Sequence, residues 1–323
     1  MAFKIGVIMD PIETIKPYKD TTFAMMLEAQ TRGHYLFYIE LGDMYLADGE
    51  AWAITHQIVV SDQTQDSYAN DNWFEKSKGG CHIKLEDLDV ILMRKDPPFD
   101  MEFIYVTYIL ERAQQAGTLV VNDPASIRSA NEKLFTSWFP QCCPETIVDR
   151  SAHRILDFVK QHQKTIIKPL DGMGGASIFS LTHNDSNCNV IIETLTNHGT
   201  KFAMVQRFIP DITKGDKRIL MVNGEPIDYS LARIPASGEN RANLAAGGKG
   251  EGQKLSAHDR WICSQIGPVL RKKGLLFVGL DVIGDYLTEI NVTSPTCARE
   301  LDSIFGINIC GKLFDVIEGL VKC

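Results

Sequence analysis

The feature that most constrains this fold is a change in the pattern of the sequence near residues 122–131. Before it, short apolar strands alternate with amphipathic helices, and one helix is expected between the N-cap Asp20 and Gly33. Beyond it, a helix is expected to open at residues 131–134, and predicted strands then follow one another as antiparallel pairs, two of which are joined at Asn223-Gly224. Strand–helix–strand units build parallel sheets, so the two parts need different sheets. We therefore expect an α/β domain followed by an α+β region.

The composition excludes several classes of protein. Hydrophobic residues make up 44% and charged residues 23% of the 323 residues, which is typical of globular proteins. No apolar run approaches the roughly 20 residues of a membrane helix, and no signal-peptide cleavage site is evident, so we expect a cytoplasmic protein. The net charge of −8 argues against nucleic acid and anionic membranes as partners. The eight cysteines and eight histidines lack the spacing of disulfide frameworks or transition-metal sites.

A glycine-rich segment, IKPLDGMGGAS at residues 167–177, is the first candidate for chemistry. Glycines at a hairpin tip let backbone N–H groups approach phosphate oxygens, and Lys168 adds a positive charge at the end of the preceding strand. The segment is not a Walker P-loop, because no Lys-Ser/Thr pair follows the glycines. The chain also lacks a G-x-G-x-x-G motif after its first strand, so we do not expect NAD. An ordinary glycine-rich turn remains the alternative.

Three oxygen-bearing side chains recur in the segment GLDVIGDYLTEIN at residues 279–291. A three-residue loop at 284–286 would place Asp281 opposite Glu289, with Asn291 two residues further along the same face. No basic partner is expected on that face. Oxygen ligands of this kind suit Mg²⁺, whereas a merely hydrated hairpin face is the alternative.

Basic residues and a long loop complete the candidate features. Arg218 and Arg233 lie on neighbouring predicted strands, where their guanidinium groups can bind phosphate or carboxylate through two nitrogens. A glycine-rich loop at 235–252 lies between a strand and a helix and has the composition of a lid. We expect the hinge residues of such a lid to let it close over a reactive intermediate.

The glycine-rich segment at 167–177, the strands with Arg218 and Arg233, the loop at 235–252 and the hairpin at 279–291 follow one another along the chain. In this order they resemble the motifs of the ATP-grasp superfamily. The segments MDPIETIKPYKDTTFAMMLEAQTRGH, NLAAGGKGE and GLDVIGDYLTEINVTSPTC then resemble bacterial glutathione synthetases over nearly the whole chain. The resemblance implies a Rossmann-like (pre-ATP-grasp) N-terminal domain at 1–128 and a two-lobed ATP-grasp fold. Its central lobe is expected at 129–208 and its C-terminal lobe at 209–323, with the lid at 235–252.

The resemblance also implies a reaction. ATP phosphorylates the cysteinyl carboxylate of γ-glutamylcysteine, and the amine of glycine attacks the acylphosphate, which releases glutathione, ADP and phosphate. Such a ligase uses ATP as a co-substrate and Mg²⁺ (or Mn²⁺) as a cofactor. Its partners are small molecules, and the resemblance implies a homotetramer.

The roles of individual residues follow from motif position. The metal is expected on Asp281, Glu289 and Asn291, and Arg218 and Arg233 are expected to stabilise the transferred phosphoryl group. ATP contacts are expected from Lys133, Lys168, Gly172, Gly174, Gly175, Ser177, Gln206, Arg207, Phe208, Ile209 and, near the ribose, Asp216. Contacts with the other substrates are expected from Arg94, Lys95, Asp96, Arg241, Ser294, Pro295 and Thr296. No general base is evident.

Two other functions remain open. An ATP-grasp ligase with different substrates would join D-alanine to D-alanine or add glutamate to a protein terminus. The segments RKDPPFD and SPT favour glutathione synthesis over these reactions. A nucleotide-binding scaffold without catalysis would be expected to have lost a metal ligand, yet all three are present.

Overall fold

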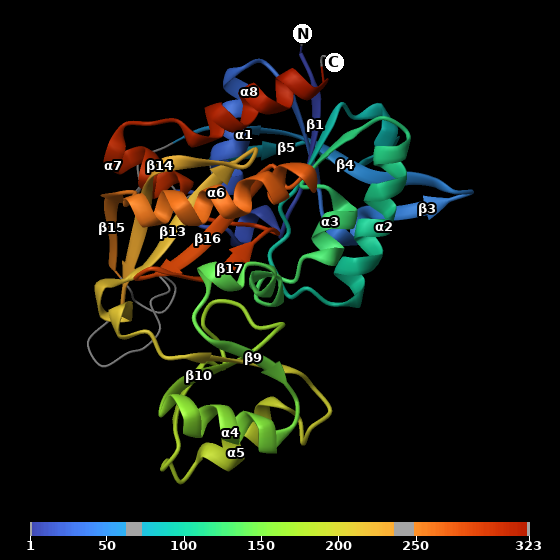
Figure 1. The fold of residues 1–323 in the computed structure, drawn as a ribbon. Helices are drawn as coiled ribbons and strands as arrows, with labels where there is room; N and C mark the ends of the chain where they lie inside the picture. The colour runs from blue at the N-terminus through green and yellow to red at the C-terminus, as the bar shows by residue number, and fades with distance from the viewer. Residues whose placement is uncertain (1, 63–72, 236–248, 322–323) are drawn as a thin grey trace.

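The computed structural model describes residues 2–62, 73–235 and 249–321 (Figure 1). A large body contains both ends of the chain, and a smaller lobe lies below it in the view of Figure 1. Residues 236–248 of the expected lid, Arg241 among them, lie outside the described residues.

The N-terminal domain is built on an eight-stranded sheet whose centre is parallel, as the sequence predicts. The parallel strands lie in the order β2 (Tyr35–Ile39), β1 (Lys4–Ile8), β7 (Val90–Met93) and β8 (Leu119–Val121). Its helices are α1 (Thr21–Thr31), α2 (Met101–Gln115) and α3 (Pro124–Ser129). The Asp20 carboxylate accepts a hydrogen bond from the Phe23 amide at 2.7 Å, which confirms this residue as an N-cap.

An antiparallel extension of this sheet was not expected from the sequence. It consists of β3 (Met44–Ala47), β4 (Glu50–Val60), β5 (Phe74–Lys76) and β6 (Cys81–Lys84), all joined to the parallel centre through β4. Polar residues interrupt the apolar pattern of most of this stretch. Its strands therefore lack the buried-type runs by which β1 and β7 are recognised.

The small lobe is a four-stranded antiparallel sheet with two helices. Its strands lie in the order β11 (Phe179–Thr182), β10 (Lys164–Pro169), β12 (Ala203–Arg207) and β9 (Thr146–Asp149), beside α4 (Ala152–His162) and α5 (Cys188–Leu195). Ile155, Val159, Ile167 and Leu181 belong to a hydrophobic core that is separate from the cores of the body. The lobe therefore folds around its own side chains.

The segment that leads into the small lobe differs from the sequence prediction. A helix was expected to open at residues 131–134, but the chain forms the 3-10 helix η5 (Leu134–Trp138) instead. The Asn131 side chain accepts hydrogen bonds from the amides of Lys133 and Leu134, which fixes a turn in place of a regular first helical turn. Other 3-10 helices are η1 (Ile12–Thr14), η2 (Leu41–Asp43), η4 (Leu85–Asp87), η6 (Pro140–Cys142) and η7 (Pro210–Lys214).

The C-terminal region is a five-stranded antiparallel sheet. Its strands lie in the order β15 (Lys249–Lys254), β14 (Glu225–Ile234), β13 (Asp216–Val222), β16 (Phe277–Ile283) and β17 (Tyr286–Asn291). The helices α6 (Ala257–Lys272), α7 (Ala298–Phe305) and α8 (Ile309–Val321) complete it. Residues 249–252, which were expected in the glycine-rich loop, instead form the first part of β15.

The hairpin β16–β17 has the expected side-chain register but a different loop. Asp281 lies opposite Glu289, as predicted. The loop has two residues, because Ile283 pairs with Tyr286, and an irregularity between Asp281 and Val282 restores the register. The expected three-residue loop is therefore wrong, and a bulge supplies the extra residue.

The N-terminal domain and the C-terminal sheet form one body. The buried Asn122 side chain donates hydrogen bonds to the carbonyls of Phe277 at 2.8 Å and Val292 at 2.7 Å, and accepts one from the Phe277 amide. Two hydrophobic cores also combine side chains of both parts, such as Ile91 with Val278. The N-terminal domain and the C-terminal sheet are therefore held in a fixed position relative to each other.

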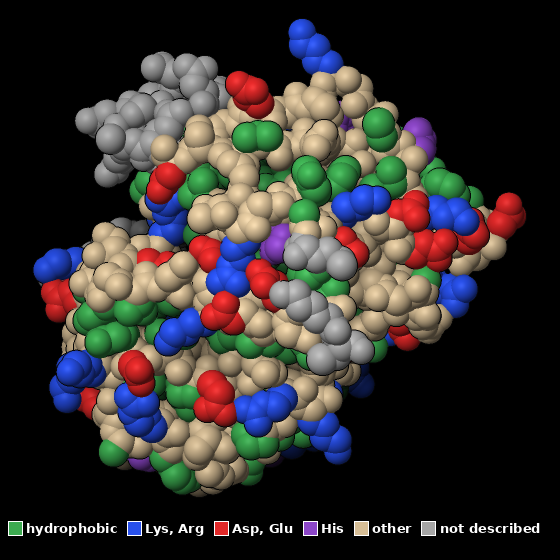
Figure 2. Space-filling model, turned by 90° about the horizontal axis from the view of Figure 1, so that it is seen from above, with side chains coloured by type: hydrophobic (Ala, Val, Ile, Leu, Met, Phe, Trp, Pro, Cys, Tyr) green, Lys and Arg blue, Asp and Glu red, His purple; other side chains and the backbone are tan. Residues whose placement is uncertain are grey.

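The surface carries both signs of charge. Figure 2 shows Lys and Arg side chains intermingled with Asp and Glu side chains on one face of the molecule. Among the described residues, no helix has both the length and the apolar character needed to cross a bilayer.

Close backbone packing between α6 and the β13–β14 turn makes the fold sensitive to a single methyl group. A Cβ atom at Gly267 would lie well inside van der Waals contact of the Gly224 carbonyl. We predict that Gly267→Ala lowers the free energy of unfolding by about 1–3 kcal/mol, although alanine favours a helix. Chemical denaturation followed by circular dichroism measures this change.

Gly319→Ala in α8 is the matched control, because a Cβ atom at Gly319 meets open space. This substitution should leave stability unchanged or raise it by up to about 1 kcal/mol. Equal effects of the two substitutions would contradict the packing explanation.

Candidate active site

Two adjoining cavities lie where the small lobe, the N-terminal domain and the C-terminal sheet meet. The first is lined by residues of β10, β12, β13, β16 and β17 and of the glycine-rich turn, including Gly172, Gly174 and Gly175. The second lies between the C-terminal sheet and the N-terminal domain. The two share Met173, Gly174 and Glu289 and are therefore continuous.

The end of β12 forms one wall of the first cavity. Gln206 is buried and donates a hydrogen bond to the Thr146 hydroxyl at 3.1 Å, while Phe208 and Ile209 line the cavity beside it. These are positions at which the sequence motifs predict contacts with ATP. The wall is the end of a strand with apolar side chains beyond it, which suits a flat heterocyclic ring.

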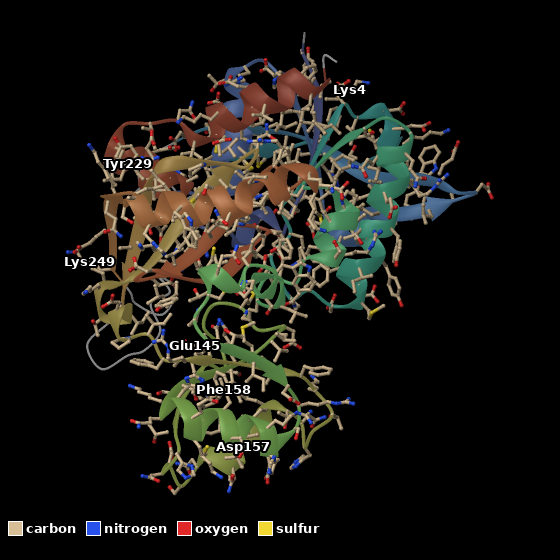
Figure 3. The ribbon with its side chains drawn as sticks, in the orientation of Figure 1. Lys4, Glu145, Asp157, Phe158, Tyr229 and Lys249 are labelled. Carbon is tan, nitrogen blue, oxygen red and sulfur yellow. The ribbon has the colours of Figure 1, made fainter. Side chains whose placement is uncertain are left out.

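Arg207 also lines the first cavity, but its guanidinium group is engaged elsewhere. Its Nε donates to the Glu145 carboxylate at 2.6 Å, and the group lies 5.1 Å from the ring centroid of Tyr286. Glu145 lies where the small lobe joins the body (Figure 3). Arg207 thus links the small lobe to the β16–β17 turn.

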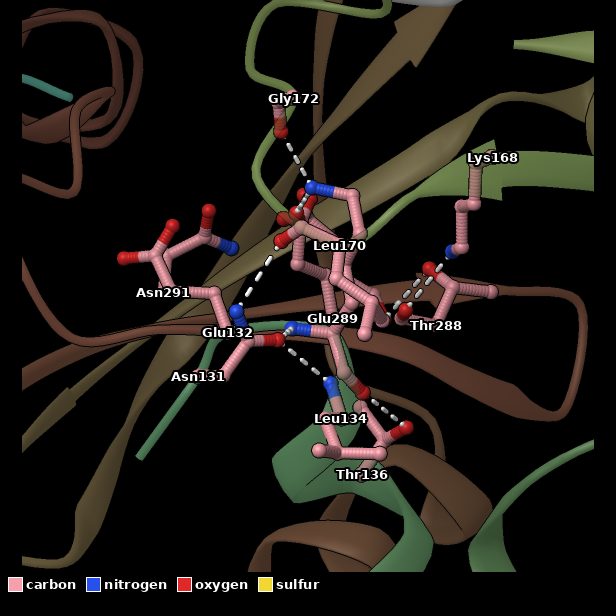
Figure 4. A network of polar contacts seen from close by, with 12 residues as sticks. Asn131, Glu132, Leu134, Thr136, Lys168, Leu170, Gly172, Thr288, Glu289 and Asn291 are labelled. Atoms are coloured by element: carbon pink, nitrogen blue, oxygen red, sulfur yellow. Dashed lines mark hydrogen bonds and ion pairs between the residues drawn. The ribbon is translucent and has the colours of Figure 1, made fainter. Parts of the chain in front are cut away.

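Two lysines converge on the hairpin β16–β17 from different parts of the chain. The Lys133 ammonium lies 2.8 Å from a Glu289 carboxylate oxygen and donates to the Gly172 carbonyl. The Lys168 ammonium donates to the Thr288 carbonyl at 3.2 Å (Figure 4). Burial lowers the pKa of Lys168 from its usual value. Both ammonium groups are therefore held close to β17. Two positive charges at one place suit the binding of a polyanion.

A ladder of charges crosses the C-terminal sheet. The sheet register places Arg218 of β13 opposite Asp281 of β16, which in turn lies opposite Glu289 of β17. Arg218 binds Asp281 through Nε at 2.5 Å and through Nη2 at 3.1 Å. Arg233 Nη2 lies 2.9 Å from Asp281 Oδ2 and 2.6 Å from Asp216 Oδ2.

These ion pairs correct one expectation from the sequence. The acids of the hairpin were expected to have no basic partner, but Asp281 is paired with two arginines and Glu289 with Lys133. The partners come from β13, β14 and the segment before η5, so the hairpin sequence alone does not reveal them. The structure therefore holds a site whose charges are already compensated.

The two aspartates of this cluster have opposite pKa shifts. Burial alone would raise the pKa of Asp281, but Arg218 and Arg233 outweigh it and hold that pKa below its usual value. Burial raises the pKa of Asp216 to about 6 in spite of Arg233. Asp216 Oδ1 is buried and, in the part of the chain described, has no hydrogen-bond partner. Asp216 lines the first cavity beside the arginines and Asp281.

Asn291 lies at the junction of β17 with the second cavity. Its side-chain nitrogen donates to the Gly279 carbonyl at 3.1 Å, which fixes the orientation of the amide. Asn291 and Glu289 both line this cavity, and Glu289 and Asp281 line the first one. The three expected metal ligands are therefore brought to the boundary of the two cavities.

The expected substrate residues divide into two groups. Asp96, Ser294, Pro295 and Thr296 line the second cavity. Arg94 is buried and is not among its lining residues, but its Nη2 donates to the Pro295 carbonyl at 2.9 Å. It therefore positions the segment that lines the cavity.

Two other expected residues do not line the cavities, and a third lies outside the described residues. Lys95 forms an ion pair with Asp10 at 2.8 Å and is not among the lining residues. Ser177 has a positive φ of 57° and is not among the residues that line the first cavity. Arg241 lies outside the described residues.

The sequence analysis missed several residues of the site. The half-buried Glu132 side chain accepts hydrogen bonds from the amides of Val292 and Thr293 and from the Thr293 hydroxyl, and so anchors the chain after β17. Lys16, Lys19, Asp20 and Glu300 line the second cavity. Lys16, Lys19 and Asp20 belong to the N-terminal segment that resembles the family, but that segment assigned them no contact with a substrate. Glu132 and Glu300 belong to no local motif, and only the position of Glu132 beside Lys133 hints at a role.

Models of two protein families match the chain. The N-terminal domain of prokaryotic glutathione synthetase matches residues 3–128, and the ATP-grasp domain of the same enzymes matches residues 132–306. Together these matches span both domains that line the cavities.

Curated relatives match over nearly the full length. A glutathione synthetase of Vibrio parahaemolyticus is 57% identical over 319 residues, with 99% of each chain covered. One of Pseudomonas syringae is 58% identical, with 98% of each chain covered, and one of Escherichia coli K12 is 56% identical, with 99% of each covered.

Solved structures of more distant proteins share the fold. D-cycloserine synthetase DcsG is 11% identical with a TM-score of 0.66, and 99% of each chain is covered. The ATP-grasp ligase PsnB is 15% identical with a TM-score of 0.61, covering 99% of this chain and 98% of its own. The fold is thus an ATP-grasp fold, and the chain belongs to the prokaryotic glutathione synthetase family.

Proposed function

We propose that this protein joins γ-glutamylcysteine to glycine at the expense of ATP, through an acylphosphate. The observation that carries the proposal is the continuity of the two cavities at Gly174 and Glu289. ATP in the first cavity would present its γ-phosphate to a carboxylate in the second. Phosphoryl transfer depends mainly on positioning and on charge neutralisation, and the junction supplies both.

The first cavity provides separate surfaces for the parts of ATP. The adenine ring would lie against the wall formed by residues 206–209, where backbone groups beyond the end of β12 could form hydrogen bonds with it. Lys133 and Lys168 would hold the phosphates, and Gly174 and Gly175 would cover them with backbone N–H groups. The Lys133 ammonium forms an ion pair with Glu289, so a phosphate at this position would compete with that carboxylate.

Arg218 and Arg233 would stabilise the phosphoryl group during its transfer and the acylphosphate afterwards. Both line the second cavity and are buried, which strengthens their interaction with a negative charge. Asp281 and Asp216 hold their guanidinium groups in place before any substrate binds. This preorganisation reduces the rearrangement that the transfer step requires.

A Mg²⁺ ion would be held by Asp281, Glu289 and Asn291. Among the described residues, no group of three His, Cys, Asp or Glu side chains is arranged to hold a metal. The donors are instead two carboxylates and one amide, an all-oxygen set that suits Mg²⁺. When bound, the ion would neutralise the charge of the β- and γ-phosphate oxygens.

The homotetramer and the cytoplasmic location stay predictions.

The substrates distinguish this proposal from its alternatives. We expect ADP release with γ-glutamylcysteine plus glycine and none above background with D-alanine alone or with glutamate plus a peptide terminus. A coupled assay of ADP measures this, and mass spectrometry of the product identifies glutathione. ATP binding without ADP release under the first condition would indicate a non-catalytic scaffold.

The charge of Glu289 should matter for turnover. We predict that Glu289→Gln lowers kcat by about 100-fold or more at saturating ATP, because it removes a negative charge from the metal site. Steady-state kinetics over a Mg²⁺ titration measures the effect. Glu225→Gln, which breaks a surface ion pair with Arg271, is the control and should leave kcat unchanged. Unchanged kcat for Glu289→Gln at saturating Mg²⁺ would refute the site.

The pairing of Lys133 with Glu289 predicts that the free protein binds Mg²⁺ weakly. Isothermal titration with MgCl₂ alone should show little binding to the wild type, and Lys133→Met should bind the ion more tightly, because Glu289 loses its competing cation. Lys217→Met removes a lysine paired with Asp259 and is the control. Equal Mg²⁺ affinities of the wild type and Lys133→Met would contradict this competition.

A further inference from the structure

The second cavity extends well beyond the reacting groups. It runs from Arg218, Arg233 and Asn291 to residues of the N-terminal domain and the first turn of α7, and its volume is about 610 Å³. Lys16, Lys19, Asp20, Asp96 and Glu300 also line it. Both signs of charge are therefore present in the cavity beside the residues of the phosphoryl-transfer centre.

Most carboxylates of this cavity are already bound to other groups. Asp10 pairs with Lys95, Asp20 caps α1, and Glu132 accepts three hydrogen bonds from residues 292–293. Burial raises the pKa of Asp96, but a hydrogen bond from Ser294 opposes this shift. These groups therefore have structural partners before a ligand arrives.

Glu300 differs from these carboxylates. It lies in the first turn of α7, after Cys297, whose backbone has a left-handed φ of 88°. Its Oε2 atom is buried and, within the described chain, has no hydrogen-bond partner. Burial raises the pKa of this carboxyl group, although a hydrogen bond from its own backbone amide and the positive charges of Lys19 and Arg299 oppose the shift. The Oε2 atom nevertheless lacks the hydrogen bond that a buried charged oxygen usually has.

The proposed dipeptide substrate carries the complementary group. Its γ-glutamyl end has an ammonium and a carboxylate on one carbon atom, at the opposite end from the cysteinyl carboxylate that receives the phosphoryl group. With that carboxylate beside Arg218 and Arg233, the zwitterionic end would lie among the other charged residues that line the cavity. Lys16 and Lys19 suit its carboxylate, and Glu300 suits its ammonium.

We propose that Glu300 binds the α-ammonium group of the γ-glutamyl moiety and so selects a γ-glutamyl peptide over acyl analogues that lack this group. The proposal rests on the proposed function and adds a specificity-determining residue to it. The ligand's positive charge supplies the partner that Glu300 lacks in the free protein. Discrimination between substrates with and without the ammonium therefore depends on the charge of this side chain.

The test compares γ-glutamylcysteine with N-glutarylcysteine, which lacks only the α-amino group. ADP release with glycine as acceptor gives kcat and KM for each substrate. The wild type should prefer γ-glutamylcysteine strongly, and Glu300→Gln should lose about tenfold or more in kcat/KM for it, mainly through KM. The value for N-glutarylcysteine should change little, and KM for ATP should stay the same. The ratio of kcat/KM for γ-glutamylcysteine to kcat/KM for N-glutarylcysteine should therefore be smaller in Glu300→Gln than in the wild type.

Glu102→Gln is the matched control, because Glu102 lies in the first turn of α2 and is exposed. It should leave both substrates unaffected. Thermal unfolding of the free protein separates a role in binding from a role in stability. Glu300→Gln removes a charge whose Oε2 atom is buried without a hydrogen-bond partner, so it should not lower Tm. A lower Tm for Glu300→Gln would show that Glu300 stabilises the fold and would overturn the proposal.

Unchanged discrimination in Glu300→Gln would also overturn it. Failure of the proposed function looks different, because the wild type itself would then release no ADP with γ-glutamylcysteine and glycine.

Discussion

The compensation of buried charges in the C-terminal sheet is the constraint on which the rest of the site depends. Arg218, Arg233 and Asp281 are buried and Asp216 is half-buried, and each is stabilised by a neighbour of opposite sign on an adjacent strand. Loss of one partner from such a cluster typically costs about 3–5 kcal/mol, because a buried charge is left alone. The register of β13, β14 and β16 is therefore tied to the positions of both guanidinium groups. Arg218 and Arg233, which stabilise the aspartates of the sheet, also line the second cavity, where they can contact a phosphoryl group.

The sequence predicted those parts of the fold that have local causes. The capped helix after Asp20 and the β13–β14 hairpin at Asn223 depend on neighbouring residues, and both form as expected. The pairing of Asp281 with Glu289 was right although the loop length was wrong, because a bulge compensates for the shorter loop. The antiparallel strands β3–β6 escaped prediction, since their polar residues hide the alternation.

The candidate site was predictable to a similar degree. The glycine-rich turn and residues 206–209 line the first cavity, as their local motifs indicate. The ion pairs of Asp281 and Glu289 were not predictable, because their partners come from other strands through tertiary structure. Glu132 and Glu300 carry no local signal either, and only the packing of distant segments gives them their place.

The separate core of the small lobe has a consequence for local stability. Its side chains pack among themselves, and the chain enters it just before β9 and leaves it just after β12. The lobe is therefore a cooperative unit that can open while the body stays native. Amide protons of β10 and β12 should then exchange with solvent through this partial opening, and those of β13 and β16 through global unfolding. A nucleotide that contacts both sheets would slow exchange in the lobe, because each opening would break the bound complex.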